Sequence, residues 1–191
     1  MQYTEVEQLI LNRLQHDLPH HLSYHSVSHV QDVINAAMFL AAEEGVQGDD
    51  LILLRTAALF HDTGFLYGAR DHEQRSCDIA MEYLPQYGYT TEQIDCICGM
   101  IMATRIPQTP QTHLEQIMAD ADLDYLGRDD FFQIGDRLYE ELSEFGIVHN
   151  EQEWNELQVR FLEAHHYFTD TAIRLRKQQK AENLQKIKDK L

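Results

Sequence analysis

Apolar residues recur at helical spacing along most of the chain. The stretch 29–44 has them three or four residues apart, at Val30, Val33, Ile34, Ala37, Leu40 and Ala41. This spacing gives a helix one apolar stripe, which it can bury against its neighbours. No segment has the alternation of period two that predicts a β-strand, and no internal repeat or glycine-rich phosphate loop is present. The pattern therefore predicts an all-α fold.

The same periodicity, with Ser, Thr, Gly and Pro at the segment ends, predicts the other helices. They cover residues 4–16, 51–64, 90–104, 112–127, 129–145, 151–168 and 169–191. A further helix carries Ile79 and stops at Pro85. A chain of 191 residues with 43% apolar content can form one domain around one core. We divide it into an N-terminal packing helix (1–21), a central functional core (22–127) and C-terminal helices that complete the same domain (128–191).

Charge is distributed unevenly along the chain. The formal net charge is −17, yet all the lysines lie between Lys177 and Lys190. An acidic body repels nucleic acids and anionic membranes, so we expect neither as a partner. No apolar run of about 18 residues occurs and the N-terminal stretch is acidic, which predicts a cytoplasmic protein. The odd set Cys77, Cys96 and Cys98 contains no CxxC pair, which favours reduced, mostly buried thiols.

The stretch 51–64, LILLRTAALFHDTG, combines an apolar helical run with an adjacent histidine and aspartate. Helical spacing from Leu51 and Leu54 turns at least one of His61 and Asp62 towards the core. A buried carboxylate must be neutral, paired or bound to a metal.

A second inward-facing carboxylate is expected in the run ADADLD. Asp122 has apolar residues four positions before and after it, whereas Asp120 and Asp124 share a polar row with Arg128. We therefore expect Asp122 to face the core and its two neighbours to lie in solvent near Arg128. One cation bound by His29, His61, Asp62 and Asp122 would satisfy both carboxylates and both imidazoles.

The chain has 11 histidines, most of them in polar or loop contexts. A single histidine on an apolar face is more often a hydrogen-bonded core residue than a ligand. The joint occurrence of several histidines with the aspartates favours a functional role for His25, His29, His61 and His72. His165 shares a face with large apolar residues, so we interpret it as part of the core or a pocket wall, with a substrate contact as the alternative.

The pattern H…HD…D resembles the HD superfamily of metal-dependent phosphohydrolases, with His29, His61-Asp62 and Asp122 at its signature positions. The resemblance covers residues 22–127 and implies an all-α bundle, a divalent ion (Mn, Mg, Fe, Co, Ni or Zn) and hydrolysis of a nucleotide or other small phosphoester. Two alternatives remain open. One is a regulatory nucleotide-binding module without turnover, and the other is a di-iron oxygenase, which the absence of a later histidine disfavours. The oligomeric state is left open.

The segment 24–33, YHSVSHVQDV, is similar to a signature of cyclic nucleotide phosphodiesterases in the same superfamily. By this resemblance His25 is the general acid, about one turn (roughly 6 Å) from the ligand His29 if the backbone between them is helical. We interpret His72 as a second-metal ligand, a phosphate contact or a catalytic acid less favoured than His25, the alternative being that it only begins its helix. We expect one firm metal site and a possible second one.

Three more residues are candidates for substrate chemistry. Glu73 can position the attacking water, although a glutamate in a first helical turn is also favoured by the helix dipole. Arg105, with Thr104 beside it, can bind a substrate phosphate, the alternative for Arg105 being a surface ion pair.

Overall fold

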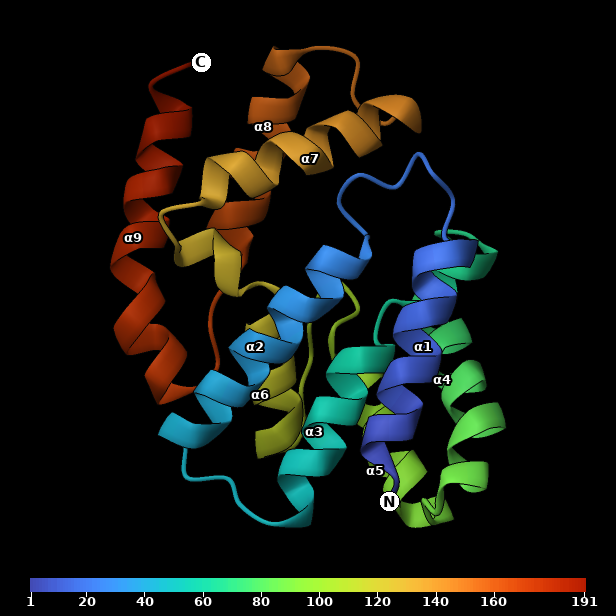
Figure 1. The fold of residues 1–191 in the computed structure, drawn as a ribbon. Helices are drawn as coiled ribbons and strands as arrows, with labels where there is room; N and C mark the ends of the chain where they lie inside the picture. Colours follow the sequence, from blue (N-terminus) through green and yellow to red (C-terminus); the bar gives the residue numbers. More distant parts are fainter. The chain divides into compact units, whose positions relative to one another are not determined.

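The computed structural model describes residues 1–191 and contains only helices, which confirms the all-α prediction (Figure 1). The α-helices are α1 (Tyr3–Asp17), α2 (Val27–Glu43), α3 (Asp49–Phe60), α4 (His72–Tyr83), α5 (Thr91–Ala103), α6 (His113–Asp122), α7 (Phe131–Glu144), α8 (Glu151–Ala164) and α9 (Asp170–Lys188). The 3₁₀ helices are η1 (Thr63–Tyr67), η2 (Leu84–Tyr87) and η3 (Asp124–Gly127). None of the helices combines the length and the apolar content that a membrane crossing requires.

The chain folds into two compact units. The first comprises residues 1–19 and 25–122, and the second comprises residues 20–24 and 123–191. In the first unit α2 packs against α3 and α6, and α5 packs against α3, α4 and α6 (Figure 1). The stripe predicted for 29–44 is buried in this packing. Because α2, α3 and α6 are neighbours, their polar ends can meet at one point.

Two helices whose ends carry candidate ligands stop earlier than the sequence pattern predicts. The predicted helix 51–64 stops at Phe60, and the backbone leaves the helical region at Asp62 (φ −108°, ψ 7°). The predicted helix 112–127 stops at Asp122, and Leu123 has φ −110° and ψ 18°. Consecutive residues of an unbroken helix point about 100° apart. The break after α3 instead lets His61 and Asp62 reach the same point.

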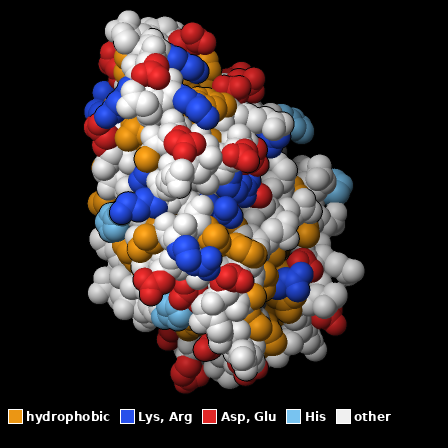
Figure 2. All heavy atoms as spheres, turned by 90° about the vertical axis from the view of Figure 1, so that its left-hand side faces the viewer, with side chains coloured by type: hydrophobic (Ala, Val, Ile, Leu, Met, Phe, Trp, Pro, Cys, Tyr) orange, Lys and Arg blue, Asp and Glu red, His pale blue; other side chains and the backbone are white.

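The second unit is built around its own apolar cluster. This cluster consists of Tyr24, Leu123, Tyr125, Leu126, Phe131, Leu162 and Ile187. Helix α9 packs against α8 and η3. The predicted helix 151–168 ends at Ala164, because His165 adopts an extended conformation with ψ 140°. The lysines all lie on α9 and just after it, and on the face that carries α9 Figure 2 shows basic side chains interspersed with acidic ones.

Candidate metal centre

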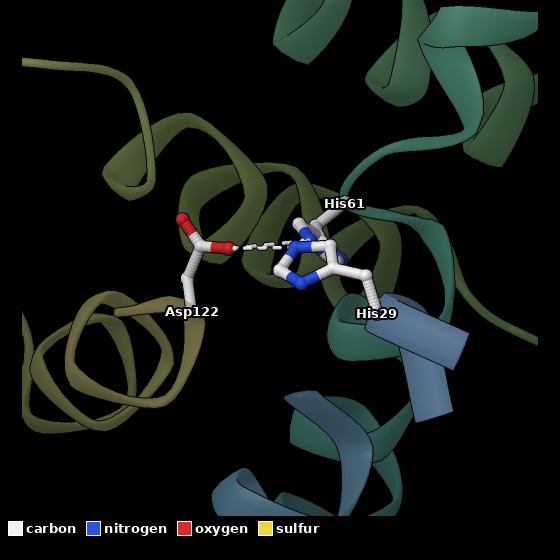
Figure 3. Close-up of side chains that lie close together, drawn as sticks. All are labelled: His29, His61 and Asp122. Carbon is white, nitrogen blue, oxygen red and sulfur yellow. Dashed lines mark hydrogen bonds and ion pairs between the residues drawn. The ribbon is translucent and has the colours of Figure 1, made fainter. Parts of the chain in front are cut away.

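Three predicted ligands converge in the first unit. His29 lies in the first turn of α2, His61 directly follows α3, and Asp122 is the last residue of α6. The Nε2 atoms of His29 and His61 are 3.3 Å apart and lie 3.4 and 3.3 Å from Oδ1 of Asp122 (Figure 3). One donor atom from each of the three lies within 4.8 Å of the others, so the group can hold a metal ion.

Asp62 adds a fourth donor atom to this group. Its Oδ2 lies 3.3 Å from Nε2 of His29 and 3.2 Å from Nε2 of His61. The atom is buried and accepts no hydrogen bond. An unsatisfied buried carboxylate oxygen is costly in a folded protein. A cation would remove that cost.

The spacing of the four atoms agrees with metal ligation. Ligand atoms about 2.1 Å from a metal ion lie about 3.0–3.4 Å from their neighbours in tetrahedral or octahedral sites. The two nitrogens lie 3.2–3.4 Å from each other and from each of the two oxygens. The ring of His61 is also fixed in a suitable tautomer, since its Nδ1 lies 2.8 Å from the carbonyl oxygen of Ala58 and donates to it. This leaves Nε2 as the coordinating atom.

The charges in the group perturb one another. Burial lowers the pKa of His29 and His61, but the carboxylates of Asp62 and Asp122 outweigh this effect, so both pKa values are raised. Burial in turn raises the pKa of Asp122, and the two imidazoles outweigh it and lower the value to about 2. The carboxylates therefore stay ionised at neutral pH, as a cation site requires.

The structure corrects the expected exposure of the aspartates in ADADLD. Asp120 and Asp124 were expected in solvent, but their exposed fractions are 0% and 2%. Asp124 does lie near Arg128 as expected, at 3.5 Å, and also accepts a 2.7 Å bond from Nε of Arg176. For Asp124 the helical row failed as a guide because the helix ends at Asp122, whereas Asp120 lies inside α6 and is buried there. Asp122, at the helix end, is the aspartate that joins the histidines.

An aromatic ring, that of Phe65, packs against both of the other candidate histidines, whose own ring centroids lie 6.2 Å apart. The ring of Phe65 stacks on His25 with centroids 3.9 Å apart, and its centroid lies 4.3 Å from that of His72. His25 precedes α2 and its ring centroid lies 6.1 Å from that of His29, close to the expected spacing although the backbone between them is not wholly helical. Nε2 of His72 lies 3.5 Å from Oδ1 of Asp62. Both imidazoles thus border the candidate metal centre.

The remaining candidates differ in exposure. Glu73 is buried, with Oε1 3.6 Å from Nε2 of His72. Arg105 is half-exposed and donates a 2.8 Å bond to Asp71, whose backbone is left-handed (φ 51°). Thr104 is buried and its hydroxyl donates to the carbonyl of Ile101. The catalytic and substrate-binding roles of these residues stay predictions.

His165 belongs to the second unit. Its ring lies edge-on to Tyr167, with centroids 4.7 Å apart, and Nδ1 is 3.0 Å from Nζ of Lys180. The interpretation as core or pocket wall agrees with these contacts. The alternative of a substrate contact remains a prediction.

Sequence reasoning missed two residues that hold the His61-Asp62 turn. The buried hydroxyl of Ser76 on α4 donates a 2.7 Å bond to the carbonyl of His61 and accepts a 2.8 Å bond from the backbone N–H of Gly64. Gly64 was interpreted only as a helix terminator, but a Cβ there would lie 2.0 Å from the carbonyl oxygen of His72. No local pattern signals Ser76, because its partners are 12 and 15 residues away.

Fold and site together define an all-α protein in which two histidines and two aspartates meet at the junction of three helices, three of them in a group that can hold a metal ion. The sequence matches the model of the HD domain over residues 26–124, which is just over half of the chain. The chain therefore belongs to the HD domain family.

Two solved structures are similar to the whole chain. One is a predicted HD superfamily hydrolase from an uncultured Thermotogales bacterium, with 20% identity, 99% of this chain and 97% of that chain covered, and a TM-score of 0.66. The other is Bacillus subtilis YpgQ in complex with ADP, with 20% identity, coverage of 99% and 95%, and a TM-score of 0.69. At this identity the likeness concerns the fold. No curated protein matches the sequence significantly.

Proposed function

We propose that this protein is a metal-dependent phosphohydrolase that acts on a nucleotide or another small phosphoester. The main support is the group of His29, His61 and Asp122, which can hold a metal ion. Beside it lies the Asp62 oxygen, 3.2–3.3 Å from both imidazole nitrogens, buried and accepting no hydrogen bond. Membership of the HD domain family and the fold shared with the ADP complex of YpgQ agree with this proposal.

These four residues would hold a divalent cation, which when bound lowers the pKa of a coordinated water and polarises a phosphoryl oxygen. The mixed nitrogen and oxygen donors suit several transition metals, so they do not select one ion. A second, weaker site near His72 and Glu73 belongs to the same proposal.

The neighbouring residues would carry the proton transfers. His25 would donate a proton to the leaving oxygen, a contribution of about 10²–10⁴-fold, with His72 as the less favoured acid. Phe65 packs against both rings and restricts the orientation of both. Buried Glu73 would orient the attacking water. Arg105 would exchange Asp71 for a substrate phosphate, with Thr104 beside it in the chain.

The test combines metal analysis with a substrate panel. The protein is purified, loaded separately with Mn²⁺, Mg²⁺, Fe²⁺, Co²⁺, Ni²⁺ and Zn²⁺, and assayed against nucleoside mono-, di- and triphosphates, cyclic nucleotides and generic phosphodiesters. We expect hydrolysis with at least one metal and none with Asp62→Ala. Stoichiometric metal and nucleotide binding without turnover would instead support a regulatory module. A mixed-valent iron signal would support an oxygenase.

A further inference from the structure

Two cysteines face each other across neighbouring helices of the first unit. Cys77 lies on α4 and Cys98 on α5, and these helices pack together. The Cys77 thiol donates to the carbonyl of Cys98 over 3.6 Å, and the Cys98 thiol points back to the carbonyl of Cys77 over 3.9 Å. This reciprocal arrangement places the two side chains side by side. Both thiols are free.

The environment makes the two sulfurs unequal. A hydrogen bond between the two side chains, followed by burial, raises the pKa of the Cys77 thiol. The same bond between the side chains lowers the pKa of the Cys98 thiol. Cys77 is 2% exposed, whereas Cys98 is partly exposed. Cys98 is therefore the more accessible of the two thiols, and its lower pKa makes it the stronger candidate for the nucleophile, with Cys77 as its neighbouring partner.

We propose that Cys77 and Cys98 form a dithiol site that peroxides oxidise to an intramolecular disulfide and that thiol reductants restore. The Cys98 thiolate would attack hydrogen peroxide, break the O–O bond and become a sulfenic acid, with hydroxide leaving. The Cys77 sulfur would then attack the Cys98 sulfur, form the S–S bond and release water. In sum, two thiols and one peroxide give one disulfide and two waters.

Oxidation of this site would be transmitted to the candidate metal centre through α4. Cys77 directly follows Ser76, whose hydroxyl bonds to both sides of the His61-Asp62 turn. An S–S bond is about 2.05 Å long, much shorter than a contact between two thiols. Closing it draws Cys77 towards α5 and shifts Ser76 away from the turn. Oxidation should therefore weaken metal binding.

A third cysteine, Cys96, serves as an internal control for the reactivity of Cys98. Cys96 lies two residues before Cys98 on α5 and is also partly exposed. Burial and the nearby carboxylates of Asp50 and Glu115 raise the pKa of the Cys96 thiol. It should therefore react more slowly than Cys98.

The metal-free full-length protein is treated with one to five equivalents of hydrogen peroxide, and thiols and peptide masses are measured. We expect the loss of two thiols and one peptide pair linked through Cys77 and Cys98, reversed by a phosphine reductant. Cys96→Ser should behave like the wild type, and Cys98→Ser should form no internal disulfide. The proposal would be overturned if Cys96 were modified before Cys98, or if a sulfenic acid formed at Cys98 and never resolved into the disulfide.

Titration of Mn²⁺ into the oxidised and the re-reduced protein then tests the coupling. At least tenfold weaker binding after oxidation is expected, and Cys98→Ser treated with peroxide should show no such change. Unchanged Mn²⁺ affinity in protein shown to carry the disulfide would overturn the coupling to the metal centre. None of these measurements uses hydrolysis, so failure of the proposed activity and failure of the dithiol site are distinguishable.

Discussion

The Ser76 hydroxyl and the carbonyl of His61 are joined by a 2.7 Å hydrogen bond, although 15 residues separate them. The hydroxyl oxygen of Ser76 also accepts a hydrogen bond from the backbone N–H of Gly64, so one side chain of α4 connects both sides of the His61-Asp62 turn. The geometry of the candidate metal centre thus depends on a helix that supplies none of its four donor atoms.

Replacing Ser76 by alanine should therefore weaken metal binding. Two buried backbone groups would lose their partner, which should lower the free energy of unfolding by about 1–3 kcal/mol. Loss of such a supporting bond typically weakens metal affinity about 10–100-fold. Titration with Mn²⁺ and urea unfolding measure the two effects. Thr56→Val removes an equally buried hydroxyl, bonded to Tyr89, and should affect stability alone. Wild-type Mn²⁺ affinity in Ser76→Ala would contradict the expectation.

The substitutions Asp122→Asn and Asp124→Asn should affect different properties, the first metal binding and the second stability. Asp122 contributes a donor atom to the group that can hold a metal ion, so its amide variant should lose most metal affinity and keep its fold. Asp124 is bonded to Arg176 within the second unit, so Asp124→Asn should retain metal. Its unfolding free energy should fall by about 2–3 kcal/mol, below the range for fully buried pairs because the arginine is partly solvated. Metal analysis and thermal unfolding of both variants check this, and equal metal loss in the two would refute it.

A methyl group at Gly64 should disturb the start of α4. Gly64→Ala would place Cβ 2.0 Å from the backbone carbonyl of His72, and backbone cannot move aside as a flexible side chain can. We expect a loss of stability of about 1–3 kcal/mol together with weaker metal binding. Gly99→Ala is the control, because its Cβ would meet only the flexible carboxylate of Glu115, at 3.1 Å. Similar effects of the two substitutions would argue against a special role for the Gly64 contact.

The stability of the second unit should rise with pH in the range where Lys180 titrates. Burial lowers the pKa of Lys180 to about 8 from 10.5, so between these values the unfolded chain holds a proton that the folded chain has released. The free energy of unfolding should then rise with pH, by at most about 1.4 kcal/mol per pH unit and less because the amine is partly solvated.

Urea unfolding at pH 7–10 of the wild type and Lys180→Met measures this effect. The wild type should gain stability relative to the variant above pH 8. Lys177→Met, a change at an exposed position on the same helix, should show no such trend. A constant difference between the wild type and Lys180→Met across the range would contradict the assignment.

The sequence by itself determined the helical class and the identity of the candidate ligands. Helix periodicity is local, so the apolar stripe of α2 could be recognised without any knowledge of its neighbours. The selection of Asp122 over Asp120 and Asp124 was also local, but the expectation that the other two lie in solvent was wrong. Asp120 is buried within α6, and the burial of Asp124 depends on the helix break after Asp122 and on a partner, Arg176, that is 52 residues away.

Only the tertiary structure decided how the site is supported. Three contacts between separate elements are marked by no local pattern: Phe65 against His25 and His72, Ser76 across the His61-Asp62 turn, and Cys77 beside Cys98. Periodicity states which face of a helix is buried, but it does not state which residue of another helix packs against that face. The candidate donor atoms can therefore be found in the sequence, whereas the geometry that makes them a candidate metal site follows from packing.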